Sequence, residues 1–189
     1  MKAIYSFLFA IALSIFSIPY LNAQSTEGTE FWLTFGSIAD IPMTPSTISS
    51  FDFRIRIVAG NITTTATIHF TSLNKDTTFT IAPYEIYTYI LDNNEKPAVY
   101  TIPTGTTDYS MRTTTSHPVS VYALRQFNSI CDVSNLLPVT ALGTEYYAIS
   151  YHDCFLEIDA YSVVAIQNNT DLHHNDTLVA TLDAGGGLL

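Results

Sequence analysis

The chain has 189 residues, of which 47% are hydrophobic and 13% are charged, and its formal net charge at neutral pH is −10. This length fits one ordinary domain, or one small domain with part of another. The basic residues are scattered along the chain, and the absence of a basic cluster argues against nucleic acids and anionic membrane surfaces as partners.

The first 23 residues have the order of features that defines a secretory signal peptide. Lys2 is followed by an uncharged apolar run over residues 3–17, Pro19 interrupts the run, and Ala23 supplies a small residue before Gln24. A membrane-spanning helix needs about 20 apolar residues, and Pro19 falls within that reach. We therefore predict cleavage between Ala23 and Gln24. The mature chain is then secreted or lies on the outer cell surface, with no transmembrane segment.

Short alternating runs of β-branched and aromatic residues fill the rest of the chain, as is typical of half-buried strands. In the clearest run, residues 51–58, apolar side chains alternate with Arg54 and Arg56, so the two kinds face opposite sides. We predict an all-β, β-sandwich-like fold, with a short helical turn or an ordered loop over residues 132–142. Further strands are predicted at residues 65–70, 78–81, 84–90, 109–114, 119–124, 146–151, 161–167 and 177–182.

A pattern near the N-terminus recurs later in the chain. Residues 28–35 read GTEFWLTF and residues 143–150 read GTEYYAIS, and similar segments follow both in the same order. The alternative is coincidence in a chain rich in threonine and tyrosine, but the matching order favours a duplication. This predicts a first β-sandwich-like unit over residues 24–142 and a partial second β unit over residues 143–189. Because the second unit lacks counterparts of several strands, we expect the sequence to be a truncated piece of a longer polypeptide.

Two cysteines, Cys131 and Cys154, belong to the mature chain. In an oxidising compartment such a pair indicates one disulfide bond. The alternative is two buried, unpaired thiols, because the distance and orientation that a disulfide requires cannot be read from sequence.

Catalytic and metal-binding patterns are weak in this sequence. His152, Asp153 and Cys154 are neighbours, but adjacent residues on a strand point to opposite faces and do not converge. Neither a Gly-x-Ser-x-Gly nor a His-Glu-x-x-His motif occurs. Residues 171–176 (DLHHND) match no calcium-loop or zinc spacing and read as a solvated turn. We predict no enzymatic activity, no metal and no cofactor.

Several aromatic residues lie on predicted strands and are candidates for ligand contact. Trp32, Tyr87 and Tyr89 could form a platform on which a glycan stacks. Aromatic side chains on strands more often belong to the core or to cross-strand pairs. These three residues are therefore the candidate ligand contacts, with packing as the alternative.

Three segments resemble a known family in residue pattern and in order: residues 28–35, the strand 117–123 (HPVSVYA) and residues 136–147 (LLPVTALGTEYY). Their arrangement is similar to the IgGFc-binding protein N-terminal domain family, whose members are β-rich extracellular modules in secreted and surface proteins of Bacteroidetes-type bacteria. The resemblance implies a non-catalytic binding or adhesion module, with an unidentified extracellular protein or glycan as ligand. Two alternatives stay open: an accessory β-module of a larger secreted glycan-degrading enzyme, or a structural spacer of a surface stalk.

Overall fold

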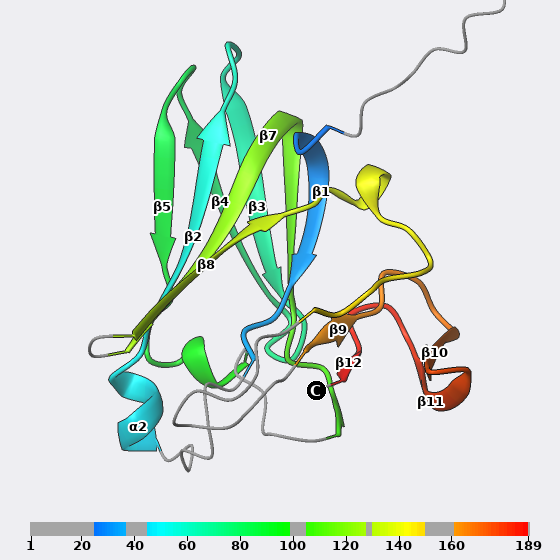
Figure 1. The fold of residues 1–189 in the computed structure, drawn as a ribbon. Helices are drawn as coiled ribbons and strands as arrows, with labels where there is room; N and C mark the ends of the chain where they lie inside the picture. Colours follow the sequence, from blue (N-terminus) through cyan, green and yellow to red (C-terminus); the bar gives the residue numbers. More distant parts are fainter. Residues whose placement is uncertain (1–24, 37–44, 99–104, 128–129, 150–160, 189) are drawn as a thin grey trace, which may run out of the picture.

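The computed structural model describes residues 25–36, 45–98, 105–127, 130–149 and 161–188 (Figure 1). Its regular structure is almost entirely β, which confirms the all-β prediction. The helical elements are α2 (Pro45–Ser49), η1 (Lys96–Ala98) and η2 (Val139–Ala141). The strands are β1 (Gly28–Leu33), β2 (Asp52–Ala59), β3 (Thr64–Phe70), β4 (Lys75–Ile81), β5 (Ile86–Ile90), β6 (Thr106–Thr107), β7 (Met111–Phe127), β8 (Ile130–Leu136), β9 (Val163–Val164), β10 (Thr170–His174), β11 (Thr177–Leu182) and β12 (Gly187–Leu188).

The long strand β7 organises a seven-stranded antiparallel sheet, in which the order is β4-β3-β7-β2-β5 and both β1 and β8 also pair with β7. Its beginning pairs with β1 and β3, and its end pairs with β8 and β2. Gly28 of β1 and Ala59 of β2 both pair with Val119, so β1 and β2 lie on opposite edges of β7. The sheet therefore has a first half (β1, the start of β7, β3 and β4) and a second half (β8, the end of β7, β2 and β5).

The sheet bends between its two halves. Residues 116–118 of β7 pair with neither β2 nor β3, and Pro118 has no N–H group to donate to a ladder. Two backbone hydrogen bonds join the end of β2 to the residues just before β5. The Tyr84 N–H donates to the Gly60 carbonyl (2.8 Å), and the Ala59 N–H donates to the Glu85 carbonyl (3.0 Å). The result is a curled sheet with its concave side inward (Figure 1).

The concave side of the curled sheet holds one hydrophobic core. The alternation predicted for residues 51–58 is confirmed, because Phe53, Ile55 and Ile57 are fully buried while Arg54 and Arg56 face outward. Fully burying one such large apolar side chain contributes roughly 1.5–3 kcal/mol. The core consists of Phe31, Leu33, Phe35, Phe51, Phe53, Ile55, Ile57, Ala59, Ala66, Ile68, Phe70, Ile81, Leu91, Met111, Val119, Val121 and Ala123.

The last described segment, residues 161–188, packs beside the first half of the sheet. Strands β10 and β11 form a hairpin, and β12 lies between β9 and β6 in a three-stranded sheet. The Ser110 hydroxyl donates a hydrogen bond of 2.7 Å to the Gly185 carbonyl, next to the start of β7. The ladder between β6 and β12 thus joins residues from both predicted units. The division of the chain after residue 142 stays a prediction.

Several predicted elements differ in the structure. Only Val163 and Val164 of the strand predicted at residues 161–167 form a strand, β9, and the strands predicted at residues 109–114 and 119–124 are joined in the single strand β7. Residues 132–136 belong to strand β8, which pairs with the end of β7, and only η2 matches the helical turn predicted within residues 132–142. Residues 143–149, which echo the sequence of β1, form no strand, and Tyr147 is 92% exposed. A strand needs a partner edge to satisfy its backbone groups, and residues 143–149 pair with no described strand.

Candidate functional site

The three candidate aromatic residues do not form one platform. Trp32 lies half-buried on the outer side of β1, between the buried core residues Phe31 and Leu33. Tyr87 and Tyr89 lie on the inner side of β5 and pack against the core. The structure therefore places Trp32 on the opposite side of the sheet from the two tyrosines.

Tyr89 belongs to a network around a buried carboxylate. Glu95 is only 1% exposed, and its Oε1 atom accepts hydrogen bonds from the Tyr89 hydroxyl (2.6 Å) and the Lys75 ammonium (2.7 Å). Its Oε2 atom accepts from the Asp92 N–H (2.9 Å). Burial, together with the hydrogen bond to Glu95, raises the pKa of Tyr89 because both disfavour the phenolate. The network links β4, β5 and the turn before η1, which gives Tyr89 a structural role.

The other predicted positions fall partly outside the described residues. Cys131 is exposed on β8 and forms no disulfide with another described residue. Its predicted partner, Cys154, lies outside the described residues, so the disulfide stays a prediction. Ala23, Gln24, His152 and Asp153 also lie outside them. Among the described residues there is no group of three or more His, Cys, Asp or Glu side chains placed to hold a metal ion.

The predicted solvated turn of residues 171–176 is an exposed hairpin in the structure. Residues 171–174 belong to strand β10, and only Asn175 and Asp176 form the turn to β11, with positive φ angles of 48° and 64°. Two side chains of this hairpin already have partners: Asp171 accepts a hydrogen bond from Thr181 (2.6 Å), and His174 contacts the Tyr161 hydroxyl (2.5 Å). The hairpin is thus held by a contact between its two strands and by a contact with Tyr161.

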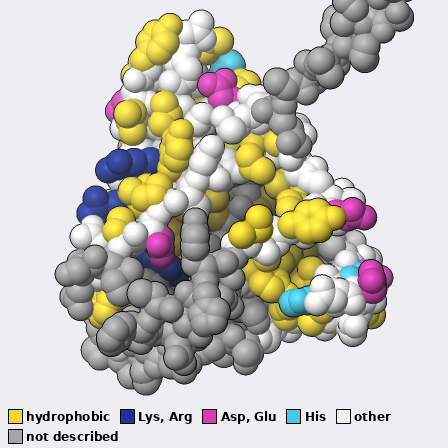
Figure 2. All heavy atoms as spheres, viewed as in Figure 1, with side chains coloured by type: hydrophobic (Ala, Val, Ile, Leu, Met, Phe, Trp, Pro, Cys, Tyr) yellow, Lys and Arg dark blue, Asp and Glu magenta, His cyan; other side chains and the backbone are white. Residues whose placement is uncertain are grey.

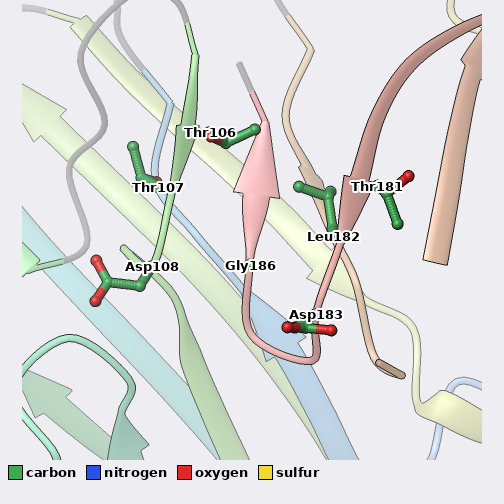
Figure 3. A pocket seen from close by; sticks show the side chains of 7 residues that line it. All are labelled: Thr106, Thr107, Asp108, Thr181, Leu182, Asp183 and Gly186. Carbon is green, nitrogen blue, oxygen red and sulfur yellow. The ribbon is translucent and has the colours of Figure 1, made fainter. Parts of the chain in front are cut away.

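A hollow of about 400 Å³ lies where β6, the end of β11 and the turn before β12 meet (Figure 3). It contains two carboxylates, but the Asp108 side chain points away from Asp183 (Figure 3). Asp183 already accepts a hydrogen bond from the Asn169 N–H (3.1 Å). The two acids are therefore not arranged as a catalytic or metal-binding pair.

The outer side of the second half of the sheet combines large apolar side chains with two arginines, and we call it the basic–apolar face. Figure 2 shows basic side chains among hydrophobic ones on the side of the molecule where β2 and β5 lie. Cross-strand register brings its members together from four strands. They are Ile86 and Ile90 of β5, Arg54, Arg56 and Val58 of β2, Tyr122 and Leu124 of β7, and Val133 of β8.

Exposure and charge distinguish the basic–apolar face from ordinary surface. Ile86, Ile90 and Val133 are 62%, 58% and 59% exposed. Arg54 is paired with Asp52, whereas the exposed Arg56 guanidinium makes no hydrogen bond or ion pair with any other described residue. Sequence alternation identified both arginines but not their apolar neighbours, because those neighbours come from strands distant in the chain.

Comparison with known proteins gives one match. A family model described as IgGFc binding protein matches residues 23–187. Nothing among the curated proteins or the solved structures matches the chain. None of the helices in the described part of the chain has the length and hydrophobicity needed to cross a bilayer.

Proposed function

Because the chain belongs to the IgGFc binding protein family, we propose that it is a secreted or cell-surface module that recognises an extracellular protein and has no catalytic activity. The observation that carries this proposal is the basic–apolar face. Export follows from the predicted signal peptide with cleavage between Ala23 and Gln24. We also propose that the chain comprises two β units, over residues 24–142 and 143–189.

The chemistry of the basic–apolar face suits a protein partner. Large exposed apolar patches mark interaction sites, and arginine and aromatic residues are enriched in protein interfaces. Small-molecule sites are concave, whereas this face is the outer surface of a sheet. Ile86, Ile90 and Val133 are available for burial against a complementary apolar surface.

Charge adds a second requirement on the partner. The chain as a whole carries a formal charge of −10, yet this face presents Arg56 without a carboxylate partner among the described residues. A partner that buries this face must satisfy the guanidinium, and a carboxylate does so with a charge-assisted hydrogen bond. We therefore expect a partner surface that places an acidic side chain among apolar ones.

A binding screen with a matched pair of variants tests this function. The mature chain from Gln24 is applied to immobilised extracellular proteins, with the immunoglobulin G Fc fragment as the first probe. Ile90→Asp places a charge in the centre of the face, and Ile62→Asp makes the same change at a residue that is 49% exposed in the turn before β3.

We expect saturable binding to at least one protein, weakened tenfold or more by Ile90→Asp and unchanged by Ile62→Asp. Far-ultraviolet circular dichroism verifies that both variants fold. A folded chain that binds no protein in the panel, or variants that lose binding equally, would contradict the proposal.

A further inference from the structure

A second surface lies on the outer side of the first half of the sheet, away from the basic–apolar face. Cross-strand register aligns Trp32 with Arg112, Arg112 with His69, and His69 with Asp76, in one row across β1, β7, β3 and β4. The next row aligns Glu30, Thr114, Thr67 and Thr78. Between these rows lies a hollow of about 300 Å³, which we call the polar hollow, lined by Thr67, His69, Asp76, Arg112 and Thr114.

Contacts within the two rows fix the planar groups of the hollow. Arg112 Nε donates to Glu30 Oε1 (2.9 Å), and the Arg112 guanidinium lies 5.5 Å from the centre of the Trp32 ring. The Trp32 indole N–H donates to the same Glu30 oxygen (3.0 Å). His69 Nδ1 lies 2.7 Å from Asp76 Oδ1. These contacts hold the guanidinium, imidazole and carboxylate in place before any ligand arrives.

Each lining group retains capacity for another hydrogen bond. The two terminal amino groups of Arg112, His69 Nε2, Asp76 Oδ2 and the Thr114 hydroxyl make no hydrogen bond with any described residue. The Arg112 side chain is 43% exposed and the Asp76 side chain is 65% exposed. The hollow therefore offers donors and acceptors together, which is what adjacent hydroxyl groups of a ligand require because each hydroxyl both donates and accepts.

From this arrangement we propose that the polar hollow binds a neutral carbohydrate ring. An anionic ligand is disfavoured because Glu30 and Asp76 bring two carboxylates against the one permanent cation, Arg112. A metal ion is disfavoured because no group of three ligand side chains exists in the described part of the chain. A volume of about 300 Å³ lies at the lower end of the range for small-ligand sites, which suits one sugar ring.

Trp32 provides a built-in reporter of this site because it is the only tryptophan in the chain. A ligand that engages Arg112 changes the environment of the indole that the guanidinium covers. The mature chain is titrated with methyl glycosides of glucose, galactose, mannose, fucose, N-acetylglucosamine and N-acetylgalactosamine. Each is taken to about 50 mM, well above the ~1 mM dissociation constant of weak binding. Indole fluorescence and the indole N–H resonance are followed, with glucuronate and sulfate as anionic comparisons.

Two pairs of variants localise the response. Asp76→Asn and Thr114→Val each remove one hydrogen-bonding function from the hollow. Asp176→Asn in the β10–β11 turn and Thr80→Val on β4 make the same changes at exposed positions outside it. We expect at least one neutral glycoside to give a saturable response, weakened fivefold or more by the first pair and unchanged by the second.

Three outcomes would overturn the proposal: no response to any neutral glycoside, a response only to glucuronate or sulfate, or equal binding by the hollow variants and the parent chain. Protein binding through the basic–apolar face is measured with different probes and variants. Failure of the carbohydrate proposal is therefore separable from failure of the protein-binding proposal.

Discussion

The Phe79 ring of β4 stacks on the Tyr87 ring of β5, with ring centroids 4.0 Å apart and an angle of 19° between the ring planes. The two strands are not hydrogen-bonded to each other and lie at opposite ends of the path β4-β3-β7-β2-β5. The contact therefore shows that the two ends of the sheet meet across the core. The two ends of the curled sheet are thus held together by side-chain packing and not by backbone hydrogen bonds between β4 and β5.

Truncating this aromatic pair should loosen the curl. We expect Phe79→Ala to lower the free energy of unfolding by about 1.5–3 kcal/mol, the range for burying a large apolar side chain, because Phe79 is only partly buried against the core. A double-mutant cycle with Tyr87→Ala should give a coupling energy of about 0.5–1.5 kcal/mol. Urea denaturation measures both, and Tyr147→Ala, at a side chain that is 92% exposed, serves as the control. A coupling energy of zero would contradict the packing role.

Glu95 should matter more for stability than any exposed carboxylate. Its side chain accepts hydrogen bonds from Tyr89 and Lys75, and Glu95→Gln removes the charge that strengthens both. We expect a loss of about 1.5–3 kcal/mol in the free energy of unfolding, the range for hydrogen bonds to charged groups. Thermal and urea denaturation are compared with Glu145→Gln, at an exposed residue. Equal free energies of unfolding for the two variants would contradict a stabilising role for the Glu95 carboxylate.

Tyr89 should make the folded state sensitive to alkaline pH. Its pKa is raised above the ordinary value of 10.0, chiefly by burial, so its stabilising contribution is complete below pH 10 and is lost as the pH rises further. The pKa of Lys75 is raised by its hydrogen bond to Glu95, and its contribution is lost in the same direction. Tyr89→Phe removes one of the two titrating groups. The difference in the free energy of unfolding between the parent and Tyr89→Phe should therefore shrink between pH 9 and pH 11. Urea denaturation at each pH measures this difference, and a constant value across the range would contradict the prediction.

Gly185 should be required for the docking of β12 beside the sheet. Its φ angle is +85°, and an added Cβ atom would lie 3.0 Å from Thr71 Cγ2 and 3.3 Å from the Trp32 ring. Gly185→Ala therefore combines an unfavourable backbone angle with a close contact, and we expect a cost of about 1–3 kcal/mol.

Gly105 supplies the matched control for this substitution. Its φ angle is +117°, but an added Cβ atom would meet nothing within 4 Å, so Gly105→Ala tests the backbone term alone. Hydrogen exchange at Gly187 and Leu188 and the emission of Trp32 should change more in Gly185→Ala than in Gly105→Ala. Equal changes in hydrogen exchange and in Trp32 emission for the two variants would mean that the close contact with Trp32 and Thr71 does not affect stability.

Much of the strand content was predictable from local patterns. The runs at residues 51–58, 65–70, 78–81 and 177–182 are strands in the structure because alternation of apolar and polar residues follows directly from the pleat of an extended backbone. Strand β8 was missed because Cys131 to Asn135 are all exposed, which leaves no apolar face to recognise. Residues 146–149 were wrongly expected in a strand because their aromatic composition fits one, yet no described strand pairs with them.

The candidate sites depended much less on local pattern. Trp32, Tyr87 and Tyr89 were grouped by residue type, but alternation within separate strands cannot say which faces of those strands lie on the same side of a sheet. Neither the basic–apolar face nor the polar hollow could be assembled from the sequence. The face takes its members from four strands and the hollow takes its lining from three, and pairing with β7 decides which of these strands lie side by side.

The sequence by itself determined that this chain is built from strands and which residues in the clearest of them point inward, because those properties depend on neighbours along the chain. The order of the strands, the bend near Pro118 and the two outer surfaces were decided only by the tertiary structure. The physical reason is that cross-strand pairing joins residues distant in sequence, and one shared strand, β7, sets the register for both halves of the sheet.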